Sequence, residues 1–218
     1  MIVKKIAGRA PSRVVFPRLP HTMQPVVDKN LGIHYRPSVA LAIGVCRHLG
    51  VSDASIRSVL KNFYGLPGRQ ELVAAIKGVR YINDTTATIP EASIAAIKRF
   101  SILAKKARLI LIAGGSDKKL IFSEMAEAIG RNVYHLILLP GTATERLRAE
   151  LAKREKSTSR ISVQEAGSMA QAVSMAHTLG AKGDYVLLSP GAASFGLFSN
   201  EFDRGDQFVE AVKGLQHT

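Results

Sequence analysis

The sequence is poor in cysteine and has no long hydrophobic run. Cys46 is the only cysteine among 218 residues, so the chain can form no internal disulfide, and its place in an apolar helical pattern predicts a packing role. The longest apolar runs, such as residues 109–115, are far shorter than the roughly 18 residues that a membrane-spanning helix needs. No apolar stretch of secretory length follows the basic N-terminus. We therefore expect no signal peptide and a cytoplasmic location.

Several cofactor motifs are also missing. The sequence contains no Gly-Lys dipeptide, which excludes the phosphate-binding loop G-x-x-x-x-G-K-[ST]. It contains no G-x-G, so the dinucleotide fingerprint is absent, and neither H-E-x-x-H nor paired cysteines suggest a metal site. The histidines show no ligand spacing. Redox and zinc chemistry are therefore not expected.

Acidic residues are scarce in the first third of the chain. The formal net charge is +13, and residues 1–68 hold 10 basic and 2 acidic residues, against 20 and 15 in residues 69–218. Such a segment either binds nucleic acid or polyphosphate or forms a solvated basic surface. A composition of 46% hydrophobic and 22% charged residues excludes intrinsic disorder and supplies a core for one large domain or two small ones.

The first 68 residues predict only two packed helices. Residues 1–30 are interrupted by four prolines and contain one short strand-like run at 14–16, so they do not resemble a self-contained fold. Apolar residues at helical spacing predict helices over 37–50 and from Ser52 to Phe63. Residues 64–68 hold two glycines and a proline. We place the domain boundary there, between residues 1–68 and 69–218.

The remainder of the chain predicts an α/β fold. Residues 71–76 and 79–83 flank Lys77-Gly78, which indicates a hairpin. Strands and helices then alternate, which predicts a Rossmann-like, mostly parallel sheet with helices on both faces and an N-terminal hairpin strand. The predicted strands cover residues 109–113, 133–139, 161–164 and 185–189, and the predicted helices cover 90–100, 122–129, 143–153, 168–179 and 203–215.

Three polar loops follow predicted strands, where open α/β sheets bind ligands. Residues 83–90 offer hydroxyls and a carboxylate, either to a ligand or as a helix cap. Residues 114–119 combine two glycines, which would let the backbone approach a ligand, with lysines; the alternative is an ordinary turn. The small residues of 189–196 suggest backbone donors for an anion. A nucleophilic serine is less favoured there because G-x-S-x-G is absent.

Taken together, these segments resemble the Mur ligases. The resemblance rests on Leu-Pro-Gly-Arg at 66–69, Ile-Asn-Asp-Thr-Thr-Ala-Thr at 82–88, Ala-Gly-Gly-Ser-Asp-Lys at 113–118, and Leu-Ser-Pro-Gly-Ala-Ala-Ser-Phe at 188–195. The continuation through Asn-Glu-Phe-Asp-Arg-Gly at 200–205 is typical of the branch that adds D-glutamate. The resemblance implies that residues 69–218 form the C-terminal, amino-acid-binding domain. Residues 1–68 would then be the closing helices of the central ATPase domain, without its phosphate loop.

The resemblance also implies a reaction and its participants. Mur ligases use ATP and Mg²⁺ to convert a substrate carboxylate into an acyl phosphate, which the amine of an incoming amino acid attacks. Here the amino acid would be D-glutamate and the acceptor UDP-N-acetylmuramoyl-L-alanine, bound by an N-terminal domain that this sequence lacks. We expect a C-terminal fragment of a ligase of peptidoglycan precursor synthesis, inactive alone. The alternative is a stand-alone, non-catalytic binding module that has lost the ATPase domain.

The family pattern assigns roles to individual residues. Lys118 and Thr88 would hold the α-carboxylate of D-glutamate, and Ser194 with the Phe195 amide would hold its side-chain carboxylate. Phe202 lies one position from an aromatic residue often found near the amino acid. The implied nucleotide contacts are Asp84 at the ribose, Arg69 from the linker, and His34 near the adenine.

The sequence departs from the family pattern at five positions. Tyr35 and Ser38 replace asparagines of the segment near the adenine, which weakens that assignment. Thr86 replaces a lysine and Ile89 an asparagine in the first loop. Ile121 replaces an aspartate that is common after the second loop.

Overall fold

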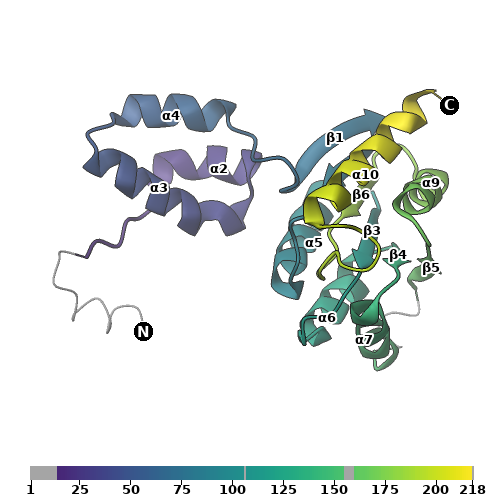
Figure 1. The fold of residues 1–218 in the computed structure, drawn as a ribbon. Helices are drawn as coiled ribbons and strands as arrows, with labels where there is room; N and C mark the ends of the chain where they lie inside the picture. The colour runs from purple at the N-terminus through teal and green to yellow at the C-terminus, as the bar shows by residue number, and fades with distance from the viewer. Residues whose placement is uncertain (1–13, 106, 155–159, 218) are drawn as a thin grey trace. The chain divides into compact units, whose positions relative to one another are not determined.

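The computed structural model describes residues 14–105, 107–154 and 160–217. The chain forms two compact units, Met1–Tyr64 and Gly65–Thr218, which we call the helical unit and the sheet unit (Figure 1). Each unit is described by itself. The basic residues Lys4, Lys5, Arg9 and Arg13, which bear on the expected absence of a signal peptide, lie outside the described residues.

The helical unit is built on a small apolar core. Met23, Ile43 and Ile56 are its buried centre, and partly buried neighbours including Cys46 pack against them, as predicted for the lone cysteine. The Oγ of Ser52 caps the last helix by accepting the N–H of Ser55 at 3.1 Å. The elements are η1 (His21–Met23), α2 (Gln24–Asn30), η2 (Ile33–Tyr35), α3 (Arg36–His48) and α4 (Asp53–Asn62).

Two expectations for this unit were wrong. Residues 14–16 form no strand, because no segment within the described ranges pairs with them. Helix α2 was missed because Pro25 suggested a break. The structure places Pro25 in the first turn of the helix, where a proline costs no hydrogen bond.

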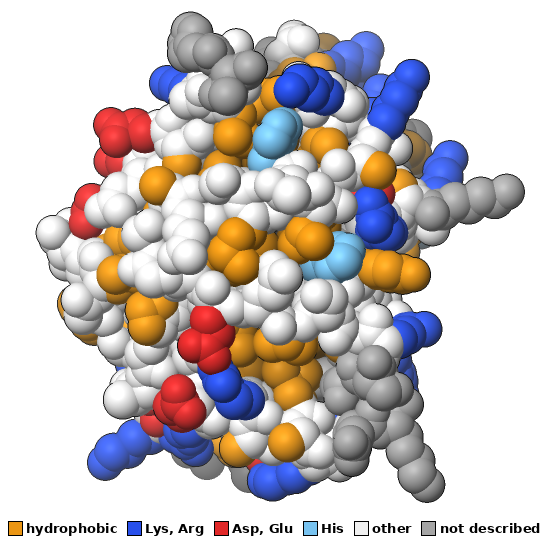
Figure 2. All heavy atoms as spheres, turned by 90° about the vertical axis from the view of Figure 1, so that its right-hand side faces the viewer, with side chains coloured by type: hydrophobic (Ala, Val, Ile, Leu, Met, Phe, Trp, Pro, Cys, Tyr) orange, Lys and Arg blue, Asp and Glu red, His pale blue; other side chains and the backbone are white. Residues whose placement is uncertain are grey.

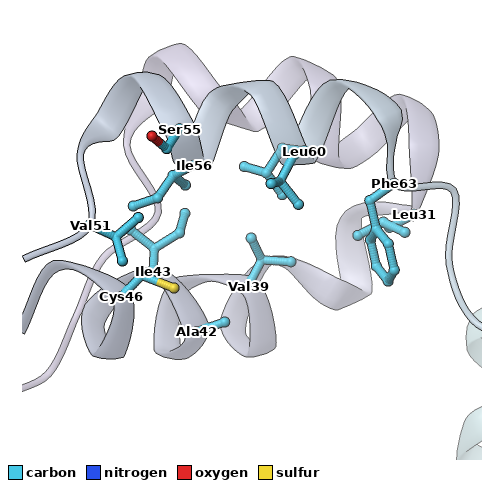
Figure 3. A pocket seen from close by; sticks show the side chains of 11 residues that line it. Leu31, Val39, Ala42, Ile43, Cys46, Val51, Ser55, Ile56, Leu60 and Phe63 are labelled. Carbon is cyan, nitrogen blue, oxygen red and sulfur yellow. The ribbon is translucent and has the colours of Figure 1, made fainter. Parts of the chain in front are cut away.

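An apolar pocket of about 310 Å³ opens between α3 and α4 (Figure 3). Val39, Leu60 and Phe63 point into this space from different elements. Other apolar side chains of the unit, such as Leu41 and Val45, are exposed. Only six hydrophobic residues among those described in this unit are buried, so it has little hydrophobic stabilisation of its own.

The sheet unit begins with the predicted hairpin. Strands β1 (Glu71–Ile76) and β2 (Val79–Asn83) pair antiparallel and have the predicted bounds. Lys77 and Gly78 connect them with φ values of 49° and 83°, the positive pair that a tight hairpin turn requires. The other strands are β3 (Leu109–Gly114), β4 (His135–Leu139), β5 (Ser162–Glu165) and β6 (Tyr185–Leu188).

Six strands form one sheet in the order β1-β2-β6-β3-β4-β5, parallel except for β1. Alternate side chains of each strand enter two cores. Leu109 and Leu111 belong to the core beneath α5 (Pro90–Ala104), α6 (Ser123–Asn132) and α7 (Thr142–Ala152). Ile110 and Ile112 belong to the core beneath α9 (Met169–Leu179) and α10 (Glu201–Gly214). The predicted α/β fold class is confirmed, with helix and strand ends shifted by a few residues.

The neighbouring strands β3 and β6 form the switch point of the sheet. After β3 the chain passes to α6 on one face, whereas after β6 it passes to α10 on the other face (Figure 1). The loops that leave the carboxyl ends of such a strand pair diverge and open a crevice between them. Two of the polar loops predicted from the sequence, residues 114–119 and 189–196, begin at these two strand ends.

The exterior of the sheet unit is mixed in character. On the face drawn in Figure 2, hydrophobic side chains form separate patches, and Lys and Arg side chains are distributed around them among acidic ones. No helix in the described ranges is both long and apolar enough to cross a membrane.

We predict that Ile43→Ala unfolds the helical unit selectively. The substitution truncates one of the three buried side chains that form the centre of this core, at a cost of about 2–4 kcal/mol. Amide hydrogen exchange should accelerate throughout α3 and α4 and stay unchanged in β3 and β6. Leu41→Ala, at an exposed position of the same helix, is the control. Equal acceleration in the two variants, or in both units, would contradict this account.

Candidate functional site

Three loops meet at the carboxyl edge of the sheet. We call residues 84–89 the first loop, residues 115–122 the second and residues 189–200 the third. The N–H of Gly191 donates to the carbonyl oxygen of Ala87 at 2.9 Å. Ser116 and Ala193 exchange two backbone hydrogen bonds, of 2.9 and 3.1 Å. The third loop thus lies between the other two and is bonded to both.

Arg204 of α10 holds the first and third loops together. Its side chain is fully buried. Its guanidinium donates to the carbonyl oxygens of Thr85 at 2.7 Å and Ala192 at 3.1 Å, and to the Thr85 Oγ1 at 3.1 Å. Burial lowers the pKa of Arg204 to about 10, so the group stays charged at neutral pH. Thr85 Oγ1 in turn donates to the carbonyl oxygen of Glu201, at 2.6 Å.

The glycines of the second loop bring backbone against backbone. Gly115 has a φ of +133°, and a Cβ on it would lie 2.3 Å from the carbonyl oxygen of Ala193. A Cβ on Gly141 would lie 2.2 Å from the carbonyl oxygen of Gly115. The sequence analysis expected Gly114 and Gly115 to let the backbone approach a ligand. In the structure Gly115 admits the backbone of Ala193, and a Cβ on Gly114 would lie 2.3 Å from Thr144 Oγ1, so both glycines admit atoms of neighbouring segments of the fold.

Lys118 stands exposed on a turn that its neighbour fixes. The N–H of Asp117 donates to Thr142 Oγ1 at 2.9 Å, and its Oδ1 accepts the N–H of Leu120 at 3.0 Å. An ion pair with Arg146 of α7 lowers the pKa of Asp117. The hydrogen bonds and the ion pair of Asp117 fix this turn, and the exposed Lys118 side chain extends from it into solvent. Lys118 lies two residues after Ser116, which is bonded to the third loop.

The other predicted amino-acid contacts lie on the same edge. Thr88 is half-buried and follows Ala87, which is bonded to the third loop. Ser194 is buried directly after Ala193, and the ring of Phe195 is 59% exposed. Phe202, also exposed, lies in the first turn of α10, where the Asn200 Oδ1 accepts its N–H at 2.9 Å. Thr88, Lys118, Ser194 and Phe195 thus belong to three loops that are bonded to one another at one edge of the sheet, and Phe202 follows the third loop.

The third loop offers fewer free donors than expected. The amides of Gly191 and Ala193 already donate to Ala87 and Ser116. Those of Ser194 and Phe195 make no hydrogen bond within the part of the chain that the structure describes. Of the expected donors, the amides of Ser194 and Phe195 therefore remain available to an anion at this loop.

Asp84 is almost completely buried, with 5% of its surface exposed. Its carboxyl accepts the Ser189 Oγ–H at 2.7 Å and the N–H of Gln70. Ser189 Oγ also lies 2.9 Å from the Oγ of Ser93, which donates to the carbonyl oxygen of Ser189 at 3.0 Å. Burial raises the pKa of Asp84 to about 7, against the opposing effect of these bonds and of the Arg69 charge.

Arg69 is exposed, and its charge lowers the pKa of Asp84, whose carboxyl accepts the N–H of the next residue, Gln70. His34 belongs to the helical unit, where its ring centroid lies 4.4 Å from that of Tyr35. Ile89 and Ile121, two departures from the family pattern, are both exposed. No three His, Cys, Asp or Glu side chains within the described ranges are grouped so as to hold a metal ion.

The sequence analysis missed the residues that assemble the site. It assigned no role to Arg204, Ser189 or Ser93, nor to Thr144, whose Oγ1 accepts the N–H of Gly115 at 3.1 Å. One signal was present. Arg204, Phe208 and Val212 recur every four residues along α10 and are all buried, so the spacing placed Arg204 on the inward face of the helix.

Residues 68–192 match the family model described as "Mur ligase, glutamate ligase domain", which is more than half of the chain. The chain belongs to the Mur ligase family. The matched range covers Asp84, Thr88 and Lys118 and ends just before Ser194.

Named relatives agree with this assignment. A UDP-N-acetylmuramoylalanine--D-glutamate ligase of Roseiflexus sp. (strain RS-1) is 41% identical over 184 residues, covering 84% of this chain and 38% of the relative. The enzyme of the same name from Porphyromonas gingivalis is 37% identical over 194 residues, covering 87% and 41%. The chain thus spans about two fifths of the length of these relatives. The matched stretches exceed the sheet unit, so they include part of the helical unit.

Solved structures share the fold at low sequence identity. FolC of E. coli in complex with ADP superposes with a TM-score of 0.58 at 22% identity, covering 84% of this chain and 39% of that protein. A MurF ligase of Thermotoga maritima in complex with ADP gives a TM-score of 0.56 at 18% identity, covering 81% and 37%.

We predict that Arg204→Met destabilises this Mur ligase domain by about 2–4 kcal/mol. Methionine fills a similar volume but leaves the buried carbonyl oxygens of Thr85 and Ala192 without donors. Urea denaturation of the sheet unit, followed by circular dichroism, measures the change. Lys213→Met, at an exposed position of the same helix, should change the unfolding free energy by less than about 0.5 kcal/mol. Equal effects of the two variants would rule out the proposed clamp.

We predict that Asp84→Asn removes a pH dependence of stability. Because the folded state raises the pKa of Asp84 from 3.8 to about 7, its contribution to stability is complete below about pH 4 and is lost as the pH rises through 7. Between pH 4 and 8 the unfolding free energy of the variant should gain roughly 2–4 kcal/mol relative to the native chain. Denaturation curves at both pH values test this. A difference that does not vary with pH would show that Asp84 is ionised throughout.

Proposed function

We propose that the chain is the amino-acid-binding part of a ligase that adds D-glutamate to UDP-N-acetylmuramoyl-L-alanine in peptidoglycan precursor synthesis. The observation that supports the proposal is the convergence of the three loops that carry Thr88, Lys118 and Ser194, which are bonded to one another at one edge of the sheet. The names of the relatives support this choice of substrate. Positioning of two reactants is the main contribution that such a domain makes to amide formation.

D-glutamate presents two carboxylates and one amine. The exposed Lys118 ammonium, on a turn fixed by Asp117, suits the α-carboxylate, and the Thr88 hydroxyl of the first loop would be its second donor. The free amides of Ser194 and Phe195 and the Ser194 hydroxyl suit the side-chain carboxylate. The exposed rings of Phe195 and Phe202 would cover the aliphatic part. Binding in this way leaves the amine free to attack.

The nucleotide would be ATP with Mg²⁺, which supplies the phosphate that activates the acceptor carboxylate. Arg69 fits this role directly, because its guanidinium is exposed. Asp84 fits the nucleotide role less directly, because its buried carboxyl already accepts hydrogen bonds from Ser189 and Gln70. A ribose hydroxyl would use the remaining exposed edge. His34 stays the candidate near the adenine.

The helical unit, in this proposal, is the closing part of the central ATPase domain, within residues 1–68. Its open apolar pocket fits a segment that packs against more protein (Figure 3). UDP-N-acetylmuramoyl-L-alanine would be bound by regions present in the longer relatives and not in this sequence. The cytoplasmic location stays a prediction.

A chimera tests the assignment of activity. This chain would replace the corresponding 38% of the Roseiflexus ligase, and ligation of D-glutamate would be followed by phosphate release. Activity above that of the truncated Roseiflexus protein supports the proposal. D-glutamate binding without ligation would favour the non-catalytic binding module.

We predict that Lys118→Ala weakens D-glutamate binding to the chain by about 10- to 100-fold, because a charged hydrogen bond of about 1.5–3 kcal/mol is lost. Isothermal titration calorimetry measures the affinity. Lys119→Ala removes an equally exposed neighbouring lysine and should leave the affinity within about twofold. Equal losses in both variants would indicate a general charge effect and would refute the specific role of Lys118.

A further inference from the structure

Residues 68–71 enter the sheet unit already fastened to the first loop. The carbonyl oxygen of Gly68 accepts two hydrogen bonds from Thr86, from its N–H at 3.2 Å and from its Oγ1 at 2.9 Å. The N–H of Gly68 donates to the Glu71 carboxylate at 2.8 Å. Both the N–H and the carbonyl oxygen of Gly68, the residue before Arg69, are therefore held by hydrogen bonds.

The residue after Arg69 is fixed as firmly. Gln70 is buried, its N–H donates to the Asp84 carboxyl, and its Oε1 accepts from the Arg99 guanidinium at 2.9 Å. Its φ of +54° lies in the left-handed region, which a non-glycine residue adopts only where its surroundings compensate the strain. Its two named partners, Asp84 of the first loop and Arg99 of α5, hold this conformation.

Arg69 itself is the exposed member of this segment. Its backbone N–H donates to the carbonyl oxygen of Leu66 at 3.1 Å, and its charge acts on buried Asp84. With Gly68 and Gln70 both fixed, the direction in which the Arg69 side chain leaves the backbone is set by the first loop. An arginine on an unattached linker would have no such preference.

We propose that Thr86 and Gln70 are positioning residues that hold Arg69 beside Asp84, so that the sheet unit presents a preformed cationic contact for a nucleoside diphosphate or triphosphate. This inference rests on the proposed nucleotide role of Arg69. It also gives Thr86, which departs from the family pattern, a function: a hydroxyl at this position bonds the Gly68 carbonyl oxygen. Preorganisation of this kind strengthens binding because less conformational freedom is lost on contact.

Amide hydrogen exchange in the full chain tests whether Thr86 fixes the segment. Thr86→Val keeps the shape and removes the Oγ1 bond to Gly68, and should speed exchange of the Gln70 N–H by about five- to tenfold. Thr86→Ser should restore the native rate. Thr178→Val, which removes a similar hydroxyl bond to Ser174 in α9, is the control and should leave Gln70 unchanged. Native exchange at Gln70 in Thr86→Val would overturn the inference.

ADP titrations of the same variants, followed by NMR, test whether the positioning of Arg69 strengthens nucleotide binding. Arg69→Ala should weaken ADP binding by about tenfold, Thr86→Val by about three- to tenfold, and the double variant no more than Arg69→Ala alone. Multiplying losses in the double variant would show that Thr86 does not act through Arg69, and would overturn the inference. Unchanged affinity in Arg69→Ala, or no ADP binding by the native chain, would instead refute the proposed nucleotide role, while the exchange rates would still report whether the segment is fixed.

Discussion

The candidate site depends on one buried guanidinium. Arg204 donates to backbone oxygens of the first and third loops, and those loops carry Thr88, Ser194 and Phe195. A fully buried cation is costly unless its donors are satisfied, so its retention requires both loops to keep their present conformation. The hydrogen bonds of Arg204 therefore stabilise the N-terminal end of α10 and also fix the spacing of the groups that would bind an amino acid. Stability and site geometry are coupled through this side chain.

The sheet supplies the second constraint. Because β3 and β6 are neighbours whose chains leave toward helices on opposite faces, their loops lie together at the carboxyl edge, where open α/β sheets bind ligands. The backbone exchange between Ser116 and Ala193 joins the second loop to the third. Because Gly115 has no Cβ, the second loop can approach Ala193 closely enough for this exchange. The second loop can therefore present Lys118 without covering the third loop. Rigid placement of donors, rather than a reactive side chain, is the chemistry that this edge of the sheet provides.

The sequence predicted the parts of the fold that depend on local patterns. The hairpin bounds were correct because Lys77-Gly78 suits its tight turn, and the apolar strands such as β3 could only be buried in a parallel sheet. Helix α2 was missed because a proline in the first turn looks like a breaker. The loops that carry Thr88, Lys118 and Ser194 were identified, but the bonds that join them were not. Arg204 and Thr85 are 119 residues apart in the chain, and Ser189 and Asp84 are 105 apart, so no local pattern could reveal either contact.

The central claim is that the three loops form a single site selective for D-glutamate. NMR titration of the full chain with D-glutamate and L-glutamate, with backbone amides assigned, tests it most directly. The account predicts that D-glutamate shifts amides of residues 86–89, 116–120 and 193–196 together, with one affinity, and that L-glutamate binds at least about tenfold more weakly, because with both carboxylates held its amine would point where D-glutamate has only the Cα hydrogen. Shifts confined to one loop, shifts elsewhere on the surface, or equal binding of the two enantiomers would contradict it.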